Sequence, residues 1–279
     1  MGKYQEQPRI NVETEKSQDR LPDGTEQEYY LKKNKEWPKL DRRLGKPRML
    51  KNIYFSEVFK WIQSIHKDNP DDFSYFEAGC GHGNDLRAIK EKLEGRGRFF
   101  GVDMSEAEIK HGLEFYHGQE DMEESKKIFA QGDVRDLRHI NIWDKDKGDF
   151  SQPSAVGDGE FDLVYFEAIL HGLGYGKDTY QEKKDSAQRM LNELYRICKP
   201  GGRFFGRAST FGPSITKEQQ FELLRETNNW RFIPGAEEFE RMLKQAGFIN
   251  IKKTLDRHEK VEENPDKRNI LRFSFLAEK

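Results

Sequence analysis

The chain has 279 residues, a length that accommodates one large α/β domain with extensions. Hydrophobic residues make up 34% of it, which is enough for a buried core, and charged residues make up 35%. The two signs nearly cancel, to a net charge of -2. This balance excludes a global basic field of the kind that draws proteins onto nucleic acid or anionic membranes, but it is compatible with local basic patches.

The cysteines and the apolar runs limit the cellular setting. Cys80 and Cys198 lie far apart and neither has a CxxC or CxxH neighbour, so we expect no metal site and no disulfide. The first residues are polar and unlike a signal peptide, and no apolar run is long enough to span a bilayer. The sequence therefore predicts a cytoplasmic protein without a membrane partner.

Residues 1–48 differ in composition from the rest of the chain. They are rich in Lys, Glu, Gln, Asp and Pro and contain few aliphatic side chains. Alone, such a segment cannot bury enough surface to offset its ordering entropy. We interpret it as an N-terminal extension that is either disordered or a lid over a bound ligand, and residues 49–279 as the folded domain.

Apolar spacing in that domain predicts helices and strands in alternation. Such alternation is typical of a mostly parallel, doubly wound sheet. In chain order we expect a helix over 49–67, a strand over 73–78, a helix ending near Gly95, a strand over 98–103, a helix capped by Ser105, strands over 128–130 and 161–166, a helix ended by 199–202, a strand over 203–207, a helix over 239–246, and strands over 248–254 and 271–276.

One segment does not fit this alternation. Residues 138–160 form a long polar connection with several Asp, Lys and Gly residues. A loop of this length is uncommon in a compact domain unless it is functional or disordered. We expect an insertion that is either disordered or a surface feature particular to this protein.

The strongest chemical signal is a glycine cluster between the first strand and the next helix. Glu77 is followed by Gly79, Gly81 and Gly83, which permit a tight turn and let a ligand approach the backbone where a Cβ would collide. Asp103 stands at the end of the second strand, where a carboxylate can accept both hydroxyls of a ribose. The pattern predicts a nucleoside-binding site at this end of the sheet.

These motifs resemble those of the class I S-adenosylmethionine (SAM)-dependent methyltransferases. Residues 77–83 are similar to the family's loop for the methionine part of SAM, Asp103 to the ribose ligand, and 132–134 to the element that contacts the adenine. The resemblance covers about residues 50–279 and implies a Rossmann-like sheet of seven strands with the last strand antiparallel. The cofactor-binding residues that it implies are Glu77, Gly79, Cys80, Gly81, Gly83, Asp103, Met104, Asp133, Val134 and Phe166.

A nicotinamide-dependent dehydrogenase is the nearest alternative. Its fingerprint requires G-x-G-x-x-G, whereas here the third glycine, Gly83, comes two residues after the second. Asp85 at the start of the helix would also repel a pyrophosphate, which favours the positive end of the helix dipole. Because SAM carries a cationic sulfonium and no phosphate, an acidic site suits it better.

Candidates for catalysis follow the fourth strand. Glu167 and His171 stand where ligands gather in open α/β sheets, so either could act as a base toward the acceptor. The alternatives are that His171 only lines the pocket and that Glu167 contacts the amino group of SAM. The acceptor-binding residues that we expect are Tyr30, Tyr54, His171, Arg207 and Trp230.

The acceptor itself is weakly specified. The segment after the fourth strand, 165–168, lacks the Asn-Pro-Pro-Tyr motif of methyltransferases that act on nucleobases or glutamine, which favours an oxygen or nitrogen of a small-molecule metabolite. A basic stretch over 32–51 keeps an RNA (tRNA or rRNA) methyltransferase open. A catalytically silent, methyltransferase-like partner subunit is a further alternative. The sequence indicates neither the acceptor atom nor the oligomeric state.

Overall fold

A computed structural model of the protein describes residues 47–115, 126–167, 169–174, 179–211, 232–255 and 270–279. The proposed N-terminal extension therefore lies outside the described residues, apart from its last two. In chain order the helical segments are η2 (Met49–Lys51), α2 (Phe55–Ile65), η3 (Pro70–Asp72), α3 (Asn84–Lys92), α4 (Glu106–Phe115), η4 (Leu170–Gly174), α6 (Tyr180–Ile197) and α8 (Ala236–Ala246). The strands are β1 (Ser74–Ala78), β2 (Arg98–Asp103), β3 (Phe129–Gly132), β4 (Ile140–Asp144), β5 (Asp149–Ser154), β6 (Phe161–Glu167), β7 (Cys198–Phe211), β8 (Ile249–Leu255) and β9 (Ile270–Glu278).

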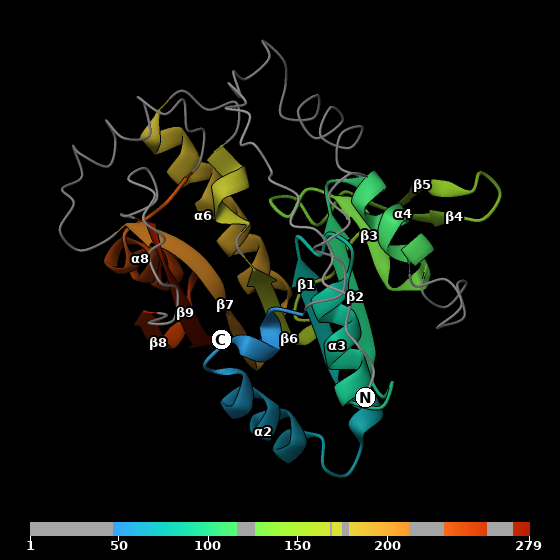
Figure 1. Cartoon of the computed structure of the whole chain (residues 1–279), viewed down its shortest axis with the longest axis horizontal. Coiled ribbons are helices and arrows are strands. Elements are labelled where there is room, and N and C mark those ends of the chain that lie inside the picture. Colours follow the sequence, from blue (N-terminus) through green and yellow to red (C-terminus); the bar gives the residue numbers. More distant parts are fainter. Residues whose placement is uncertain (1–46, 116–125, 168, 175–178, 212–231, 256–269) are drawn as a thin grey trace, which may run out of the picture.

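These strands form one mixed sheet in the order β5-β4-β3-β2-β1-β6-β7-β9-β8 (Figure 1). The central pairs, from β3 through β7, are parallel. Strand β9 runs antiparallel to both of its neighbours, β7 and β8. The predicted Rossmann-like α/β fold, mostly parallel with an antiparallel strand near its end, is confirmed, but the sheet has nine strands and not seven, because β4 and β5 lengthen it.

The central strands are covered on both faces. Every residue of β1 is buried, as are the first six of β6, which explains why these strands lack an alternating polar pattern. Apolar residues of α2, α3 and α4 pack on one face with Tyr75, and those of α6 and α8 pack on the other with Phe76. The carboxyl ends of β1, β2 and β6 therefore lie between two packed layers.

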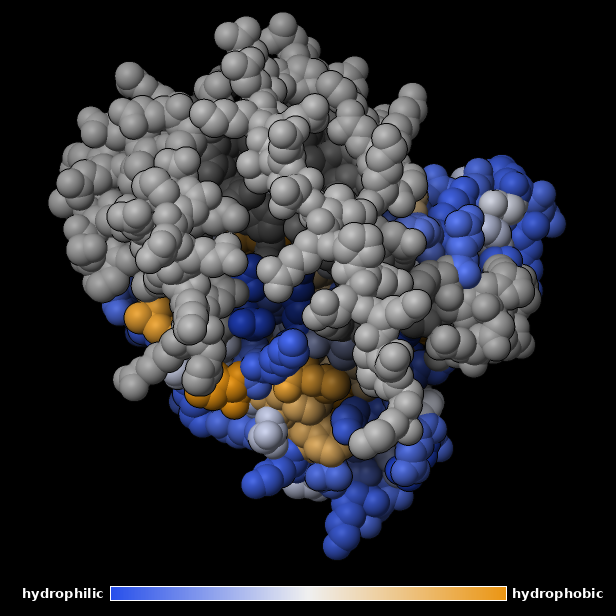
Figure 2. Space-filling model, viewed as in Figure 1, coloured by the Kyte–Doolittle hydropathy of each residue, from blue (hydrophilic) through white to orange (hydrophobic). Residues whose placement is uncertain are grey.

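The helix predicted over 49–67 is interrupted. Asn52 takes an extended conformation between η2 and α2. Its side chain donates a hydrogen bond to the carbonyl of Gly206 (3.0 Å) and accepts one from the backbone of Tyr54 (2.9 Å). Asparagine competes in this way with helical hydrogen bonds, so the helix divides there. Figure 2 shows a hydrophobic surface in the region of η2 and α2, where Ile53 is 60% exposed.

The segment 138–160 is ordered, and the alternative of a disordered insertion is wrong. It forms a hairpin in which β4 pairs antiparallel with both β3 and β5. The turn is closed by the backbone of Gly148 donating to Asp144 (2.8 Å), with Gly148 at a φ of +71°. The polar residues that made this segment resemble a loop belong to that turn and to the solvent side of an edge hairpin.

Candidate active site

The glycine loop between β1 and α3 is held in place by backbone hydrogen bonds. The amides of Gly79 and Cys80 both donate to the carbonyl of Val102, at 2.8 and 3.1 Å, and Gly83 donates to the carbonyl of Cys80 at 2.8 Å. Gly79, Gly81 and Gly83 have φ values of +67°, +50° and +73°. Residues other than glycine rarely adopt these positive φ values, so the three glycines allow the backbone to follow this path.

The glycines differ in what a side chain would meet. A Cβ at Gly79 would collide with Ile169, and one at Gly83 would collide with the ring of Phe129. At Gly81 the nearest atom to such a Cβ would be a carboxylate oxygen of Glu108, at 3.9 Å. Two of the glycines thus serve internal packing, while the backbone at Gly81 is open to close approach by a ligand.

Asp103 joins the loop to the second strand. Its carboxylate accepts hydrogen bonds from the backbone amides of Gly81 (2.8 Å) and Ser105 (2.9 Å). Burial raises the pKa of Asp103 to about 6, and these two amide bonds oppose that increase. Each carboxylate oxygen can accept more than one hydrogen bond, so the group can orient the loop and still accept ligand hydroxyls.

Glu77 is buried below the loop and is 3% exposed. Its Oε2 accepts a hydrogen bond from the hydroxyl of Tyr75 at 3.5 Å. Burial raises the pKa of Glu77 well above its ordinary value, and the nearby carboxylate of Asp85 raises it further. Two buried carboxylates so close to each other favour a cation in their neighbourhood.

Asp85 takes a position that the sequence did not indicate. Its carboxylate points inward and accepts a hydrogen bond from the amide of Met49 (2.7 Å). Burial raises the pKa of Asp85, and backbone hydrogen bonds from Met49 and Arg48 oppose that increase. Asp85 therefore does not face a ligand at the helix terminus, as the sequence had suggested; its carboxylate holds the 48–52 segment against α3.

Asp133 and Val134, of the predicted adenine element, follow β3, and the predicted cofactor residue Met104 follows β2. Val134 is buried, and the backbone carbonyl of Met104 accepts from Gln131 at 3.4 Å. Asp133 makes a close bidentate pair with Arg135, in which both carboxylate oxygens lie 2.8 Å from Nε. Arg135 thereby holds the carboxylate in one orientation at the rim of the site.

Two predicted cofactor residues present only their backbone to the site. The side chain of Phe166 is 0% exposed and packs against the rings of Phe204 and Phe275, on the face covered by α6 and α8. The side chain of Cys80 is buried on the other face, and burial raises the pKa of its thiol well above the ordinary value. Contacts of either side chain with a cofactor would require the core to open.

Glu167 and Arg207 come together at the ends of β6 and β7. They are directly opposed in the parallel register, and an Nη of Arg207 lies 3.6 Å from Oε1 of Glu167. The hydroxyl of Tyr165 donates to the other carboxylate oxygen at 3.0 Å. Oε1 of Glu167 is buried and has no hydrogen-bond partner among the described residues. Burial raises the pKa of this carboxyl, while Arg207 opposes the increase.

The remaining predicted residues are only partly placed. The backbone of His171 lies in η4, just beyond β6. The hydroxyl of Tyr54 is 2.7 Å from that of Thr254 in β8, which ties Tyr54 to the far side of the sheet. Tyr30 and Trp230 lie outside the described residues. The structure thus brings Glu77, Asp103, Glu167 and Arg207 to one end of the sheet. Tyr54 instead contacts β8 through its hydroxyl.

A histidine pair beside the loop was not among the predicted site residues. Nε2 of His82 lies 2.9 Å from a carboxylate oxygen of Glu108 and 3.2 Å from a ring nitrogen of His111. Because Glu108 and His111 lie on α4, this contact fastens the loop to the helix that follows β2. The sequence offered one related signal, Ser105 as the predicted cap of the helix that carries Glu108. The hydroxyl of Ser105 accepts a hydrogen bond from the amide of Glu108 (3.2 Å).

The residues present fit a cationic nucleoside such as SAM. The backbone is open at Gly81, and buried carboxylates lie below the loop and on either side of it. Oε1 of Glu167 is a buried acceptor that can receive a donor from a ligand. Within the described ranges, no group of three or more His, Cys, Asp or Glu residues is arranged to hold a metal ion.

Comparison with known sequences agrees with this geometry. The chain belongs to the methyltransferase domain family, whose profile matches residues 50–253. The chain therefore contains a SAM-dependent methyltransferase domain. A curated relative is mRNA cap guanine-N(7) methyltransferase 1 of Arabidopsis thaliana, 25% identical over 196 residues, which are 67% of this chain and 47% of the relative. The chain thus spans about half the length of that relative.

Two solved structures are similar to the chain at low identity. The geranyl diphosphate C-methyltransferase of Streptomyces coelicolor, in complex with Mg²⁺, geranyl diphosphate and S-adenosyl-L-homocysteine, has a TM-score of 0.51 and 12% identity, covering 80% of this chain and 78% of its own. Phosphoethanolamine N-methyltransferase 2 of Haemonchus contortus, in complex with SAM, has a TM-score of 0.49 and 17% identity, covering 81% of this chain and 58% of its own.

None of the helices that the structure describes is long and apolar enough to cross a membrane.

Proposed function

We propose that residues 49–279 transfer the methyl group of SAM to an oxygen or nitrogen of a small-molecule metabolite. The observation that carries this proposal is the carboxylate of Glu167 at the end of β6, whose side chain is 7% exposed and whose Oε1, 3.6 Å from Arg207, lacks a hydrogen bond among the described residues. A buried hydrogen-bond acceptor beside the SAM-binding loop suits a compact methyl-accepting molecule that carries an N–H or O–H group.

The chemistry divides between the cofactor and the chain. Bound SAM supplies an electrophilic methyl group on a cationic sulfur. The open backbone at Gly81 and the carboxylate of Asp103 hold the nucleoside, and Glu77 below the loop favours its positive charge. The work of the protein is then to keep donor and acceptor in line and to exclude water.

Glu167 is suited to orient the acceptor and to take up its proton. Burial raises the pKa of its carboxyl, which favours its taking up a proton, and the guanidinium of Arg207 at 3.6 Å opposes that increase. Tyr165 donates to the second oxygen, so Oε1, which is ion-paired with Arg207 but not hydrogen-bonded, is the oxygen that can accept from a methyl acceptor. His171 follows within four residues on η4 and is the second candidate for this role.

RNA methylation is a second candidate function. The curated relative is an mRNA cap methyltransferase, although only 25% of the aligned residues are identical. Its acceptor is a nitrogen of a guanine, and a flat base could reach the end of β6 from an RNA terminus. This alternative predicts methylation that falls steeply with added salt, since each phosphate contact releases counterions.

The test uses the full chain and SAM labelled in its methyl group. We expect label to enter a low-molecular-weight component of a fractionated metabolite extract, and the mass of that product to increase by one methylene. Label in a nuclease-sensitive fraction would instead favour the RNA acceptor. The proposed function is wrong if calorimetry detects no binding of SAM or S-adenosylhomocysteine. The catalytically silent alternative requires binding without any turnover.

A further inference from the structure

The side chain of His82, in the glycine loop, is held by α4. Nε2 of its ring lies 2.9 Å from Oε2 of Glu108 and 3.2 Å from Nδ1 of His111. The two imidazole rings meet edge to face, with 5.1 Å between their centroids. Because Glu108 is only 9% exposed, this contact is screened by solvent less than a surface ion pair would be.

The backbone of His82 packs against the same helix. A Cβ added at Gly112 of α4 would collide with the carbonyl oxygen of His82, so the glycine lets loop and helix approach closely. On the loop, His82 stands between Gly81, whose amide donates to Asp103 (2.8 Å), and Gly83, the N-cap of α3. A shift of His82 away from α4 would therefore also move the amide that orients Asp103.

The same contact lies within electrostatic reach of Asp103. Burial is the main reason that the pKa of this carboxyl rises to about 6, and the backbone amides of Ser105 and Gly81 oppose the increase. Glu108 raises the pKa of Asp103 further, whereas His82 lowers it. Because the two partners act on the carboxylate in opposite directions, they influence the pH at which Asp103 becomes an ionised acceptor.

Other groups also face Asp103. Glu77 does so from β1 and Cys80 from the loop, and burial raises the pKa of both well above the ordinary values, with Asp103 contributing to each increase. Its register partner on β3 is Gln131, which carries no charge. These three residues stay the same in the natural chain and in every variant described below, so their effect is common to all the measurements.

We propose that His82 and Glu108 are positioning residues of the cofactor site, which hold the loop against α4 and set the pH range in which Asp103 binds the cofactor ribose. They act through the amide of Gly81 and the carboxylate of Asp103. An ionised Glu108 can only accept, so the contact requires a proton on Nε2 of His82. The proposal rests on the predicted role of Asp103 as ribose acceptor and is independent of which molecule receives the methyl group.

The positioning role is tested by calorimetric titration of the full chain with S-adenosylhomocysteine at pH 5 and pH 7.5. His82→Ala removes the contacts with Glu108 and His111, so we expect the Kd to rise about tenfold at both pH values. His82→Gln keeps an N–H group that can donate to Glu108 and should restore most of the affinity at pH 7.5. Thermal unfolding of each variant reports whether the domain is folded.

The electrostatic role predicts changes of opposite sign. Affinity that depends on ionised Asp103 is present above its pKa and is lost as the pH falls through about 6, so the natural chain should bind about tenfold more weakly at pH 5 than at pH 7.5. In Glu108→Gln this loss should be about threefold smaller, because a group that raises the pKa of Asp103 is gone. In His82→Gln the loss should be about threefold larger, because a group that lowers that pKa is gone.

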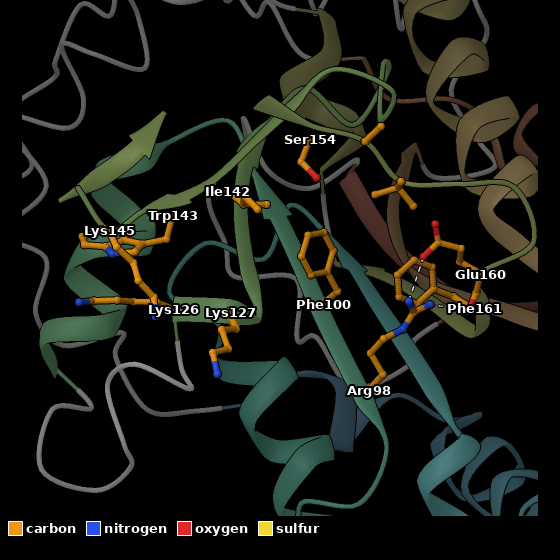
Figure 3. Close-up of a pocket in the computed structure, with 12 residues that line it drawn as sticks. Arg98, Phe100, Lys126, Lys127, Ile142, Trp143, Lys145, Ser154, Glu160 and Phe161 are labelled. Carbon is orange, nitrogen blue, oxygen red and sulfur yellow. Dashed lines mark hydrogen bonds and ion pairs between the residues drawn. The ribbon is translucent and has the colours of Figure 1, made fainter. Parts of the chain in front are cut away.

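Glu160→Gln is the matched control. Its carboxylate pairs with Arg98 at 3.0 Å and accepts the amide of Gly157. Both Glu160 and Arg98 line a cavity of about 300 Å³ beside the β4–β5 hairpin (Figure 3). Arg98 begins β2 and Asp103 ends it, so the control removes an ion-paired acid toward the opposite end of the sheet. It should leave the affinity for S-adenosylhomocysteine and its pH dependence unchanged.

Three results would overturn the proposal. They are natural affinity in His82→Ala at both pH values, a pH dependence that changes in the same direction or not at all in the two glutamine variants of the loop contact, and a change in Glu160→Gln as large as that in Glu108→Gln. Each of these leaves the proposed methyl transfer unaffected, because the natural chain still binds the cofactor product. Absence of binding by the natural chain would contradict both proposals.

Discussion

The two ends of the sheet present different kinds of side chain. At the carboxyl ends of β1, β2 and β6, the carboxylates of Glu77, Asp103 and Glu167 lie buried or nearly so, and burial raises the pKa of each. Toward the amino ends of β2 and β6, lysines line a cavity over an aromatic floor. One end is therefore lined by buried acids and the other by basic and aromatic side chains.

The two ends also differ in how firmly their residues are held in place. The acidic end is fixed by backbone amides that donate to Asp103 and by glycines whose φ values other residues rarely adopt. The basic end is made of long side chains on an edge hairpin, held by packing and by a cation–π contact. Substitutions at the acidic end should therefore have large effects on binding, while those at the hairpin should have small ones.

The largest effect is expected at Gly79. Gly79→Ala places a methyl group against Ile169 at a φ of +67°, so the loop must move, and we expect SAM binding to fall by more than about 100-fold. Gly95→Ala is the matched control, because Gly95 has a φ of +75° but open space around it. It should cost about 1–2 kcal/mol of stability and keep cofactor affinity. Equal affinities in the two variants, measured by calorimetry, would contradict a role for close packing at Gly79.

Asp103→Ala should have the next largest effect. It removes the acceptor for the amides of Gly81 and Ser105 together with the acceptor for ligand hydroxyls. Because hydrogen bonds to charged groups contribute about 1.5–3 kcal/mol each, we expect a loss of SAM affinity of about 100-fold. Asp144→Ala removes a partly exposed carboxylate that accepts backbone amides in the hairpin turn, and it should leave the affinity unchanged. A loss of similar size in both variants would indicate general destabilisation.

Glu167→Gln tests the acceptor side of the same end. The amide keeps the shape and the contact with Tyr165 but cannot take up a proton, so we expect kcat to fall by about 10–100-fold with little change in SAM affinity. Glu160→Gln is the counterpart in the hairpin cavity and should leave kcat unaltered. A change confined to SAM affinity would instead assign Glu167 to the cofactor amino group.

A pH effect of about tenfold is the smallest expected. The pKa of free aspartate is about 3.9, and burial raises that of Asp103 to about 6. If ligand hydroxyls donate to the ionised carboxylate, affinity for S-adenosylhomocysteine should rise about tenfold from pH 5 to 7 and then level off. Asp103→Ala should lose this dependence while retaining Glu77 and Glu167. An unchanged pH profile in that variant would place the titration on another group.

The same shift has the opposite consequence for stability without ligand. Since the folded state binds the proton of Asp103 more tightly than the unfolded chain, its contribution to the free energy of unfolding is present below about pH 4. That contribution is lost as the pH rises through about 6. Chemical denaturation at pH 4 and pH 7, compared between the natural chain and Asp103→Ala, measures the difference.

Much of the fold was accessible from local patterns. The strand at 98–103 and the helix after Ser105 follow from apolar spacing and a cap residue, and both form where predicted. The prediction of one continuous helix over 49–67 was wrong because the side chain of Asn52 donates a hydrogen bond to Gly206, a residue 154 positions away in sequence. The hairpin over 140–154 was missed because its edge position tolerates polar residues that otherwise indicate a loop.

By itself, the sequence determined the path of the cofactor loop and the type of ligand, because glycines at positive φ and an acid after the second strand act locally. Only the tertiary structure decided which side chains meet. Register opposes Glu167 to Arg207, strand alternation turns Phe166 into the core, and the 48–52 segment brings Met49 to Asp85. These contacts join residues distant along the chain, and each depends on strand pairing or packing that no local pattern contains.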